Sequence, residues 1–119
     1  MATHNEFGKE GERIAMEYLM DKGYIILERN WRYKKLEIDL IAEYQNITII
    51  IEVKSRSNDS FGKPQEFVRK KKIKLVLEAV NAYANTKNQD LNFRLDVISI
   101  QKKNGSYTIE HLQDAFYYF

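Results

Sequence analysis

Cysteine is absent from the 119 residues of this chain, and proline occurs once, at Pro64. The lack of cysteine excludes disulfides, thiolate zinc sites and cysteine nucleophiles, and it fits a reducing compartment. No apolar run is long enough to span a bilayer, and the polar residues 1–13 lack the apolar stretch of a signal peptide. We therefore expect a cytoplasmic protein with no membrane partner.

The chain also lacks a strong excess of one charge, because 19 Lys and Arg face 17 Asp and Glu, for a net charge of +2. The distribution along the chain is more informative than the total. Six basic residues and one acid fall between residues 63 and 74, the basic ones being Lys63, Arg69, Lys70, Lys71, Lys72 and Lys74. A local basic cluster can attract a polyanion such as nucleic acid, although a lysine run by itself is better explained as a solvated helix face.

Length and composition are typical of one domain with one core, since the 119 residues are 44% hydrophobic. We therefore predict a single domain over residues 1–119. Hydrophobic periodicity and turn residues predict the order helix, three strands, helix, two strands. The predicted helices span residues 4–22 and 64–85, and the predicted strands span residues 24–30, 36–43, 47–55, 92–101 and 107–111.

The connections between these segments predict the topology of the sheet. Short turns at Gln45-Asn46 and Asn104-Gly105 predict antiparallel hairpins, and Gly23 is suited to end the first helix. The second helix predicts a crossover that brings the fourth strand parallel to the third. The sequence therefore predicts an α/β fold with a mixed five-stranded sheet flanked by helices.

The third predicted strand carries charged residues at the end of an apolar run, Ile47 to Ile51, which is typical of a central strand covered on both faces. Because strand side chains alternate, Glu52 and Lys54 lie on the same face. A carboxylate beside a core strand is costly unless it is paired or bound to a cation. An ion pair at the sheet edge is one explanation, and a metal ligand beside a catalytic ammonium is the other. The acid-x-Lys pattern alone occurs often by chance, so only its placement is informative.

The second predicted strand brings another carboxylate to this position. If the two strands pair around a two-residue turn at Gln45-Asn46, Asp39 lies directly opposite Glu52, with β-carbons about 4.5–5.5 Å apart. The same register places Glu37 opposite Lys54. A slip of one residue would send Asp39 to the other face of the sheet, so the inference depends on this register.

Two carboxylates this close repel each other unless a cation lies between them. Mg²⁺ takes oxygen ligands and keeps several waters, which suits one or two carboxylates together with a substrate phosphate. We therefore predict Asp39 and Glu52 as metal ligands for Mg²⁺ or Mn²⁺. Lys54 would orient the attacking water or stabilise charge that develops on the phosphate.

Glu12 is a candidate third acid, because it falls at the margin of the apolar stripe of the first predicted helix. Gly8 and Gly11 flank it. Glycine is costly inside a helix relative to alanine, so two glycines indicate close approach by another backbone or by a ligand. Simple packing of the helix on the sheet explains them equally well.

Taken together, these residues resemble the PD-(D/E)xK nuclease superfamily and, more closely, the bacterial UPF0102 family, which is similar to archaeal Holliday junction resolvases. The resemblance spans nearly the whole chain. It rests on five blocks of sequence, Gly8–Glu12, Glu37–Ala42, Glu52–Arg56, Phe61–Pro64 and Arg94–Val97. Leu36 departs from the pattern, because the family usually has glycine at this position.

The resemblance implies a restriction-endonuclease-like fold in which Asp39 and Glu52 are metal ligands, Lys54 is the catalytic lysine and Glu12 is the helix acid of resolvase-like members. It implies a Mg²⁺- or Mn²⁺-dependent endonuclease that acts on DNA, including branched or otherwise structured DNA. By analogy with the resolvases we also expect a homodimer. The alternative is a non-catalytic nucleic-acid-binding module with the same fold, and a third reading is an interaction protein whose acids are purely structural.

Three further residues are candidates for contact with the nucleic-acid backbone. Arg56 follows Lys54 by two residues, Gln65 lies at the start of the second predicted helix, and Lys72 lies within it. For Lys72 a solvated surface charge is at least as good an explanation. In the fourth strand we expect Asp96 to pair with Arg94 or with a base from a helix, in a structural role.

Overall fold

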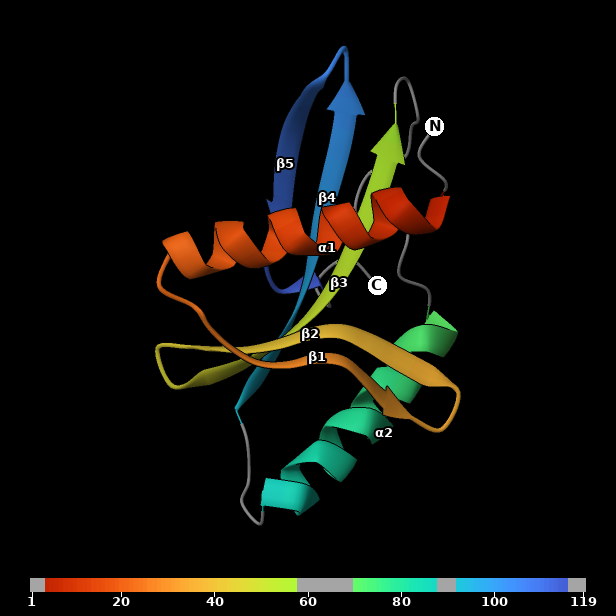
Figure 1. Ribbon diagram of the computed structural model, residues 1–119. Coiled ribbons are helices and arrows are strands. Elements are labelled where there is room, and N and C mark those ends of the chain that lie inside the picture. Colours follow the sequence, from red (N-terminus) through yellow and green to blue (C-terminus); the bar gives the residue numbers. More distant parts are fainter. Residues whose placement is uncertain (1–3, 58–69, 88–91, 116–119) are drawn as a thin grey trace.

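The computed structural model describes residues 4–57, 70–87 and 92–115 of the chain. It contains two helices and five strands in the predicted order (Figure 1). The elements are α1 (His4–Asp21), β1 (Ile25–Tyr33), β2 (Leu36–Tyr44), β3 (Ile47–Ser57), α2 (Lys70–Lys87), β4 (Phe93–Lys103) and β5 (Ser106–Leu112). The predicted start of the second helix at Pro64 lies outside the described residues.

The five strands form one sheet in the order β1-β2-β3-β4-β5. The pairs β1–β2, β2–β3 and β4–β5 are antiparallel, whereas β3 and β4 are parallel and are connected through α2. The predicted mixed sheet and its crossover are therefore confirmed. Among the described residues, neither helix is both long and apolar enough to cross a membrane.

Local turn chemistry explains where several elements end. Gly23 has a φ of +92°, and its N–H and that of Tyr24 donate to carbonyls in the last turn of α1, which ends the helix as predicted. Gln45 and Asn46 both have positive φ and join β2 to β3, as a tight hairpin turn requires. The predicted end of the first strand at Asn30 is wrong, because the strand passes through Asn30 at a φ of 52° and continues to Tyr33.

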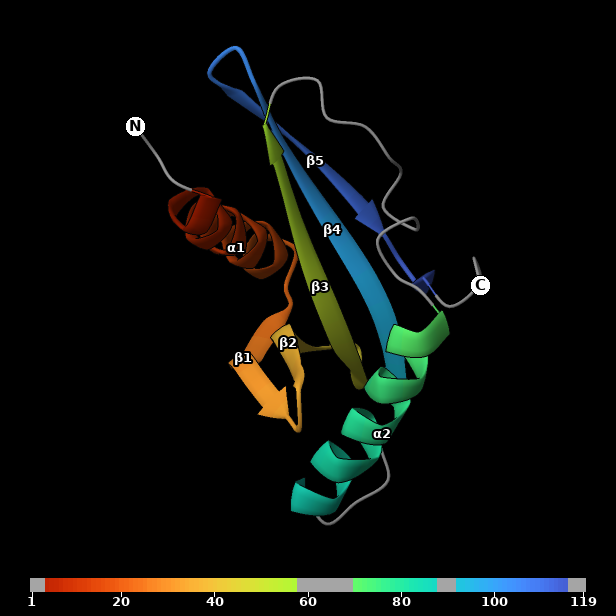
Figure 2. The same cartoon turned by 90° about the vertical axis from the view of Figure 1, so that its right-hand side faces the viewer.

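The helices cover opposite faces of the sheet (Figure 2). On the first face, α1 contributes Ala15 and Leu19 to a buried cluster that includes Ile49 and Ile51 of β3. On the second face, the residues that α2 contributes to a separate buried cluster are Val76, Ala79, Val80 and Tyr83. The strands are therefore buried on both sides, as the continuous apolar run of β3 predicts.

Strand β2 belongs to both clusters, because it changes face along its length. Leu40 and Ala42 lie in the α1 cluster, whereas Leu36 and Ile38 lie in the α2 cluster. Positions two apart on a regular strand share a face, so the strand must turn over between Ile38 and Leu40. Asp39 is the residue at this point.

The sheet also divides at the same place. Pairing between β2 and β3 runs from the turn as far as Leu40 and Ile51. Beyond this point β2 continues to pair with β1. Strand β3 instead continues beside β4 as far as Ser57. The β1–β2 hairpin consequently crosses the long β3–β4–β5 part of the sheet at a wide angle (Figure 1). The result is a fork in the sheet, which opens at Asp39 and Glu52.

Candidate functional site

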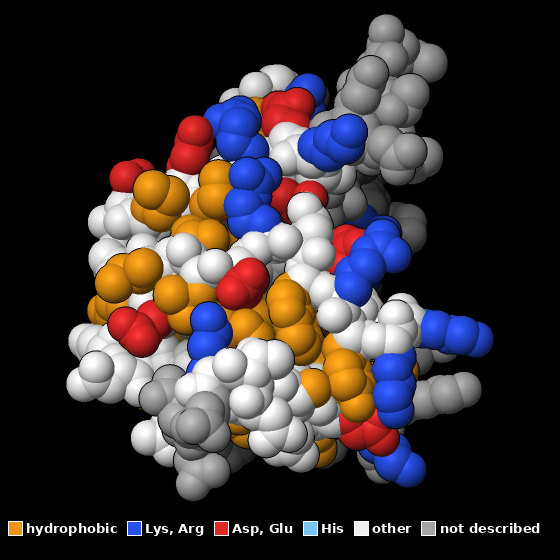
Figure 3. Space-filling view, turned by 60° about the horizontal axis from the view of Figure 1, so that its bottom comes forward, with side chains coloured by type: hydrophobic (Ala, Val, Ile, Leu, Met, Phe, Trp, Pro, Cys, Tyr) orange, Lys and Arg blue, Asp and Glu red, His pale blue; other side chains and the backbone are white. Residues whose placement is uncertain are grey.

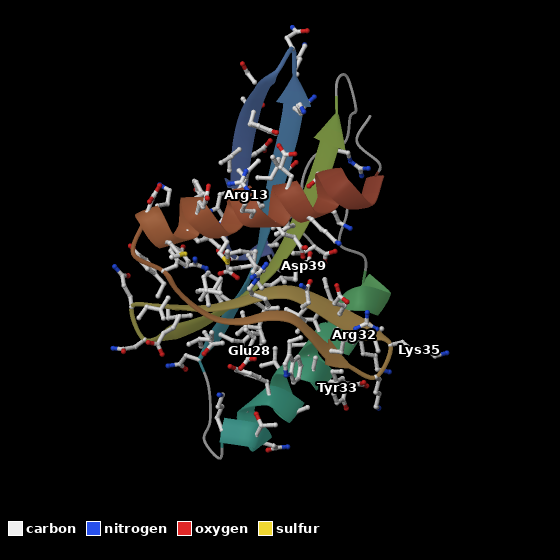
Figure 4. The ribbon with its side chains drawn as sticks, in the orientation of Figure 1. Arg13, Glu28, Arg32, Tyr33, Lys35 and Asp39 are labelled. Atoms are coloured by element: carbon white, nitrogen blue, oxygen red, sulfur yellow. The ribbon has the colours of Figure 1, made fainter. Side chains whose placement is uncertain are left out.

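Asp39 lies at the fork, between α1 and the β1–β2 hairpin (Figure 4). The register of β2 and β3 is the predicted one, and Asp39 and Glu52 stand one step beyond its last pair, Leu40 and Ile51. Here a side chain replaces the missing main-chain partner, because the Asp39 Oδ2 atom accepts a hydrogen bond from the Val53 N–H at 2.8 Å. That bond fixes the Asp39 carboxylate against the edge of β3.

Glu52 and Lys54 form an ion pair on the continuing part of β3, with 3.0 Å between the Lys54 Nζ and Glu52 Oε1 atoms. The Glu52 side chain is only 13% exposed, so its carboxylate needs a positive partner. Asp39, Glu52 and Glu37 line one pocket together with apolar side chains of β2, β3, β4 and α2. The fork therefore brings the two predicted ligands and the predicted catalytic lysine to one place.

The predicted opposition of Glu37 and Lys54 is not formed, because β2 has left β3 before that point. Glu37 instead lies opposite Arg32 of β1, and the Arg32 Nη2 and Glu37 Oε2 atoms are 3.0 Å apart. The Glu37 carboxylate is 38% exposed. It therefore belongs to the outer surface of the β1–β2 hairpin as well as to the rim of the pocket.

Glu12 of α1 approaches this rim through Asn30. With its amide nitrogen directed at the two acids, Asn30 donates to Glu12 Oε1 at 3.0 Å and to Glu37 Oε1 at 3.3 Å. Burial raises the pKa of Glu12 above 4.5 and the charge of Glu37 raises it further, while Arg29 opposes both. An acid with a raised pKa beside a pocket is a feature of many functional sites.

The two glycines beside Glu12 have different surroundings. Gly11 is buried against the end of β3, where an added β-carbon would collide with the Ser55 Oγ atom. Gly8 has no described atom within 4 Å of the position of such a carbon. Close packing of helix on strand therefore explains Gly11, and it leaves Gly8 unexplained.

The predicted nucleic-acid contacts are only partly visible. Arg56 lies on β3 opposite Gln101, with its side chain half-buried. Lys72 lies in the first turn of α2, but its side chain is outside the described part of the chain, as is Gln65 entirely. The predicted roles of these three residues stay predictions.

The donor set at the fork fits a hard divalent cation with few protein ligands. Within the described ranges, no three carboxylate or imidazole groups are close enough together to hold an ion between them. Two carboxylates, Asp39 and Glu52, nevertheless line one pocket. Mg²⁺ is an ion that accepts such a sparse set, because it keeps several of its waters.

A buried polar network lies on the α1 face of the sheet. The predicted pair of Arg94 and Asp96 is confirmed, but the other members of the network were not predicted from the sequence. Asp96 is completely buried and accepts two hydrogen bonds from Arg94, both at 2.8 Å. His111 Nε2 lies 2.7 Å from the same carboxylate, and His111 Nδ1 lies 3.0 Å from the Tyr18 hydroxyl. Arg94 also donates to the Tyr24 hydroxyl at 2.9 Å.

One feature of the sequence could have predicted that His111 lies near Asp96. The Asn104-Gly105 turn fixes the register of β4 and β5, in which His111 lies opposite Ile98. That position shares a face with Asp96, two residues away along β4. The contact with Tyr18 of α1 depends on how the helix crosses the sheet, which no local pattern indicates.

Comparison with known proteins identifies the family to which the chain belongs. Residues 11–100 match the model of "Uncharacterised protein family UPF0102". The chain belongs to the UPF0102 family. A UPF0102 protein of Flavobacterium johnsoniae is 51% identical over 123 residues, and one of Flavobacterium psychrophilum is 50% identical over 119 residues, each aligned over 100% of both chains. A UPF0102 protein of Phocaeicola vulgatus is 49% identical and covers 98% of this chain and 97% of its own.

The UPF0102 relatives span the whole of this chain, so the fork and the buried network both lie inside the family's shared length. Their names give the family and no activity. The activity of this UPF0102 protein must therefore be argued from the chemistry of its site.

Proposed function

We propose that this protein is a Mg²⁺- or Mn²⁺-dependent endonuclease that hydrolyses phosphodiester bonds in DNA, including branched or otherwise structured DNA. One observation carries the proposal. Two carboxylates from different strands, Asp39 and Glu52, line one pocket at a fork in the sheet, and Glu52 lies 3.0 Å from the Lys54 ammonium. An acidic pair beside an ammonium is suited to phosphoryl chemistry.

Asp39 and Glu52 would hold the ion through their carboxylate oxygens. Asp39 is positioned for this by its hydrogen bond from the Val53 N–H. When bound, a divalent cation supplies polarisation of a phosphoryl oxygen and a lower pKa for a coordinated water.

Lys54 would then exchange its partner. Its ammonium is paired with Glu52, and this pair would weaken if Glu52 also held a cation. The ammonium would then be able to hold the attacking water or to stabilise charge on the phosphoryl oxygens. Glu12 would act from the rim as a positioning acid, through Asn30 and Glu37.

A non-catalytic nucleic-acid-binding module is the second candidate, and one observation favours it. Glu52 already has a close cationic partner in Lys54, and among the described residues no group of three or more acidic, imidazole or thiol side chains is arranged to hold an ion. Such a closed pair also satisfies Glu52 in a protein that binds no metal. The two candidates differ in what divalent ions do.

The deciding experiment combines metal binding with cleavage. Mg²⁺ and Mn²⁺ are titrated by calorimetry into wild type, Glu52→Gln and Lys54→Met, and the same proteins are incubated with linear, nicked and branched DNA. We expect Glu52→Gln to weaken metal binding and abolish cleavage. Lys54→Met is expected to abolish cleavage while binding metal at least as tightly as wild type, because it frees Glu52 from its ammonium partner.

Each alternative has a distinct result. If wild type and Lys54→Met cut equally, the observed cleavage is a contaminant and the enzyme proposal fails. If wild type binds DNA but neither binds metal nor cleaves any substrate, the non-catalytic module is the correct description. Glu43→Gln is the matched control, because Glu43 is an exposed carboxylate on β2 that lies outside the pocket.

A further inference from the structure

We propose that the tip of the β1–β2 hairpin, which carries Arg32, Lys34 and Lys35, is a binding arm for the phosphate backbone of double-stranded DNA. The inference deepens the proposed function and rests on it, since it names where the substrate lies relative to the fork. The arm differs from the basic residues 63–74 that the sequence singles out. It is formed by the same hairpin that carries Asp39.

The arm presents its cations to solvent. Arg32, Lys34 and Lys35 are all exposed, and Figure 3 shows Lys and Arg side chains gathered along one edge of the molecule that includes this tip. In Figure 4, Arg32 and Lys35 lie at the end of the hairpin remote from its connection to α1. Three positive charges within the four residues 32–35 form a concentrated patch on a chain whose net charge is only +2.

The existing partners of these cations are weak and easily exchanged. Lys34 Nζ lies 4.0 Å from Glu78 Oε2. In the other pair, the side chain of Arg32 is 78% exposed and that of Glu37 is 38% exposed. Exposed pairs of this kind contribute little to stability, because solvent screens them. Lys35 forms no ion pair within the described part of the chain. A phosphate could therefore replace these contacts at little cost.

The turn at the tip places a lysine where the backbone conformation does not favour one. Lys34 has a φ of 55°, in the left-handed region that glycine and asparagine adopt more easily. A residue with a β-carbon is less stable than glycine in this region, because the β-carbon approaches the following carbonyl oxygen. Asparagine or glycine would therefore fit this turn position better than lysine does. Strained residues of this kind are concentrated at functional sites.

The arm is also held rigid by aromatic packing. Trp31 packs edge-on against the buried Tyr83 ring of α2, with 5.3 Å between ring centroids, and Trp31 and Tyr33 are stacked at 6.4 Å. These inward-facing rings alternate with the outward-facing Arg32 along β1. The cations therefore project from a fixed platform, which reduces the entropy lost on binding.

The spacing between arm and fork suits a nucleic-acid backbone. Lys35 lies four residues before Asp39 on β2, which is about 13 Å along a strand. Measured along the axis of a duplex, this distance is the rise of roughly four nucleotides of one strand. A duplex whose backbone lies on Lys34 and Lys35 could thus place a phosphodiester bond of the same strand at the pocket.

The test uses a double variant that removes two charges without straining the turn. Lys34→Asn suits a positive φ, and Lys35→Gln keeps the length of an exposed side chain. The matched control is Lys102→Gln with Lys103→Gln, which removes two lysines beside the β4–β5 turn, at the opposite end of the molecule (Figure 1). Thermal unfolding verifies that both proteins fold.

Binding of a fluorescent DNA duplex is measured by anisotropy in EDTA over a range of salt concentrations, so that no cleavage is required. We expect the arm variant to bind about ten-fold or more weakly at low salt, and the slope of log K against log salt to fall by about 0.9 for each lost phosphate contact. The control should remain close to wild type. Trp31, the single tryptophan of the chain, should change its emission as the duplex binds.

The proposed arm would be refuted if the arm variant and the β4–β5 control bound DNA equally well. It would also be refuted if wild type did not bind duplex DNA. The result is separate from that of the proposed function. A wild type that binds DNA and cleaves nothing, with binding lost in the arm variant, would refute the nuclease and support the arm. Where wild type cleaves, the arm variant should raise KM and leave kcat near the wild-type value.

Discussion

The carboxylate of Asp39 accepts the hydrogen bond of the Val53 N–H at 2.8 Å, so a side chain performs the pairing that β2 no longer supplies to β3. The bond needs an oxygen acceptor but no charge. Structural and chemical roles of Asp39 can therefore be separated by substitution.

Asp39→Asn should leave the protein folded, with stability close to wild type, because the amide oxygen can still accept from Val53. Asp39→Ala removes the acceptor and should lower the free energy of unfolding by about 1–3 kcal/mol. Both variants should lose affinity for Mn²⁺. Urea unfolding and calorimetry measure the two effects, and an Asp39→Asn protein that binds Mn²⁺ as wild type does would remove Asp39 from the ligand set.

Glu12→Gln should stabilise the protein at neutral pH. Burial and the charge of Glu37 raise the pKa of Glu12 above 4.5 in the folded state. Between 4.5 and the raised value, the folded protein holds a proton that the unfolded chain has released, so stability falls as pH rises through this window. Gln carries no charge and avoids this loss. The advantage of the variant should disappear below pH 4.5.

Urea unfolding of wild type and Glu12→Gln across this pH range is the measurement. Glu17→Gln provides the control, because Glu17 lies on the same helix in an exposed pair with Arg13. A Glu12→Gln protein that is less stable than wild type at neutral pH would show that the carboxylate is a structural acceptor. The same result would argue against the idea that the Glu12 carboxylate lowers the stability of the folded protein.

Asp96→Asn should destabilise the protein far more than a surface change. Burial raises the pKa of Asp96, but hydrogen bonds from His111, Arg94 and the Asp114 N–H outweigh it and leave the pKa below 3.8. Removing one partner of a buried charged network costs about 3–5 kcal/mol. Asp114→Asn is the matched control, since Asp114 contributes only its main-chain N–H to this network and has a φ of 54°, which asparagine tolerates.

The same network predicts part of the acid sensitivity. Because the folded pKa of Asp96 is lowered, the unfolded chain binds its proton first as pH falls, and stability is lost from about pH 3.8 downward. Asp96→Asn should lack this component of the pH dependence. Acid titrations followed by circular dichroism compare the two proteins, and identical slopes would show that Asp96 is already protonated when folded.

Gly8 and Gly11 should respond oppositely to alanine. Gly8→Ala should raise the free energy of unfolding by about 0.5–1 kcal/mol, because no described atom blocks the new carbon. Gly11→Ala should lower it by about 1–3 kcal/mol through collision with Ser55. Adding Ser55→Gly should recover part of that loss. A stabilised Gly11→Ala protein would mean that α1 sits farther from β3.

Much of the fold follows from patterns that are local in the sequence. The apolar run of β3 predicts a strand buried on both faces, and Gly23 and the Gln45-Asn46 turn predict where α1 and β2 end. The turn also fixes the register that brings Asp39 and Glu52 to adjacent positions. These features are predictable because each depends on residues that are neighbours along the chain.

The fork was not predictable in the same way. Ideal pairing would carry β2 along β3 to Glu37 and Lys54, but the strand turns over at Asp39, and Asn30 takes a positive φ that resembles a strand end. The contact between Glu12 and Asn30 depends on the angle at which α1 crosses the sheet. Such features arise from tertiary packing, which overrides local preference.

On strand β2, Leu36 and Ile38 pack in the α2 cluster, whereas Leu40 and Ala42 pack in the α1 cluster. Asp39 lies between these two pairs of residues. The carboxylate is therefore mechanically linked to both halves of the molecule. A shift of either helix, however remote from the pocket, would alter the position of a candidate ligand. Core substitutions such as Leu19→Ala and Val80→Ala are therefore expected to affect the chemistry at the fork as well as folding.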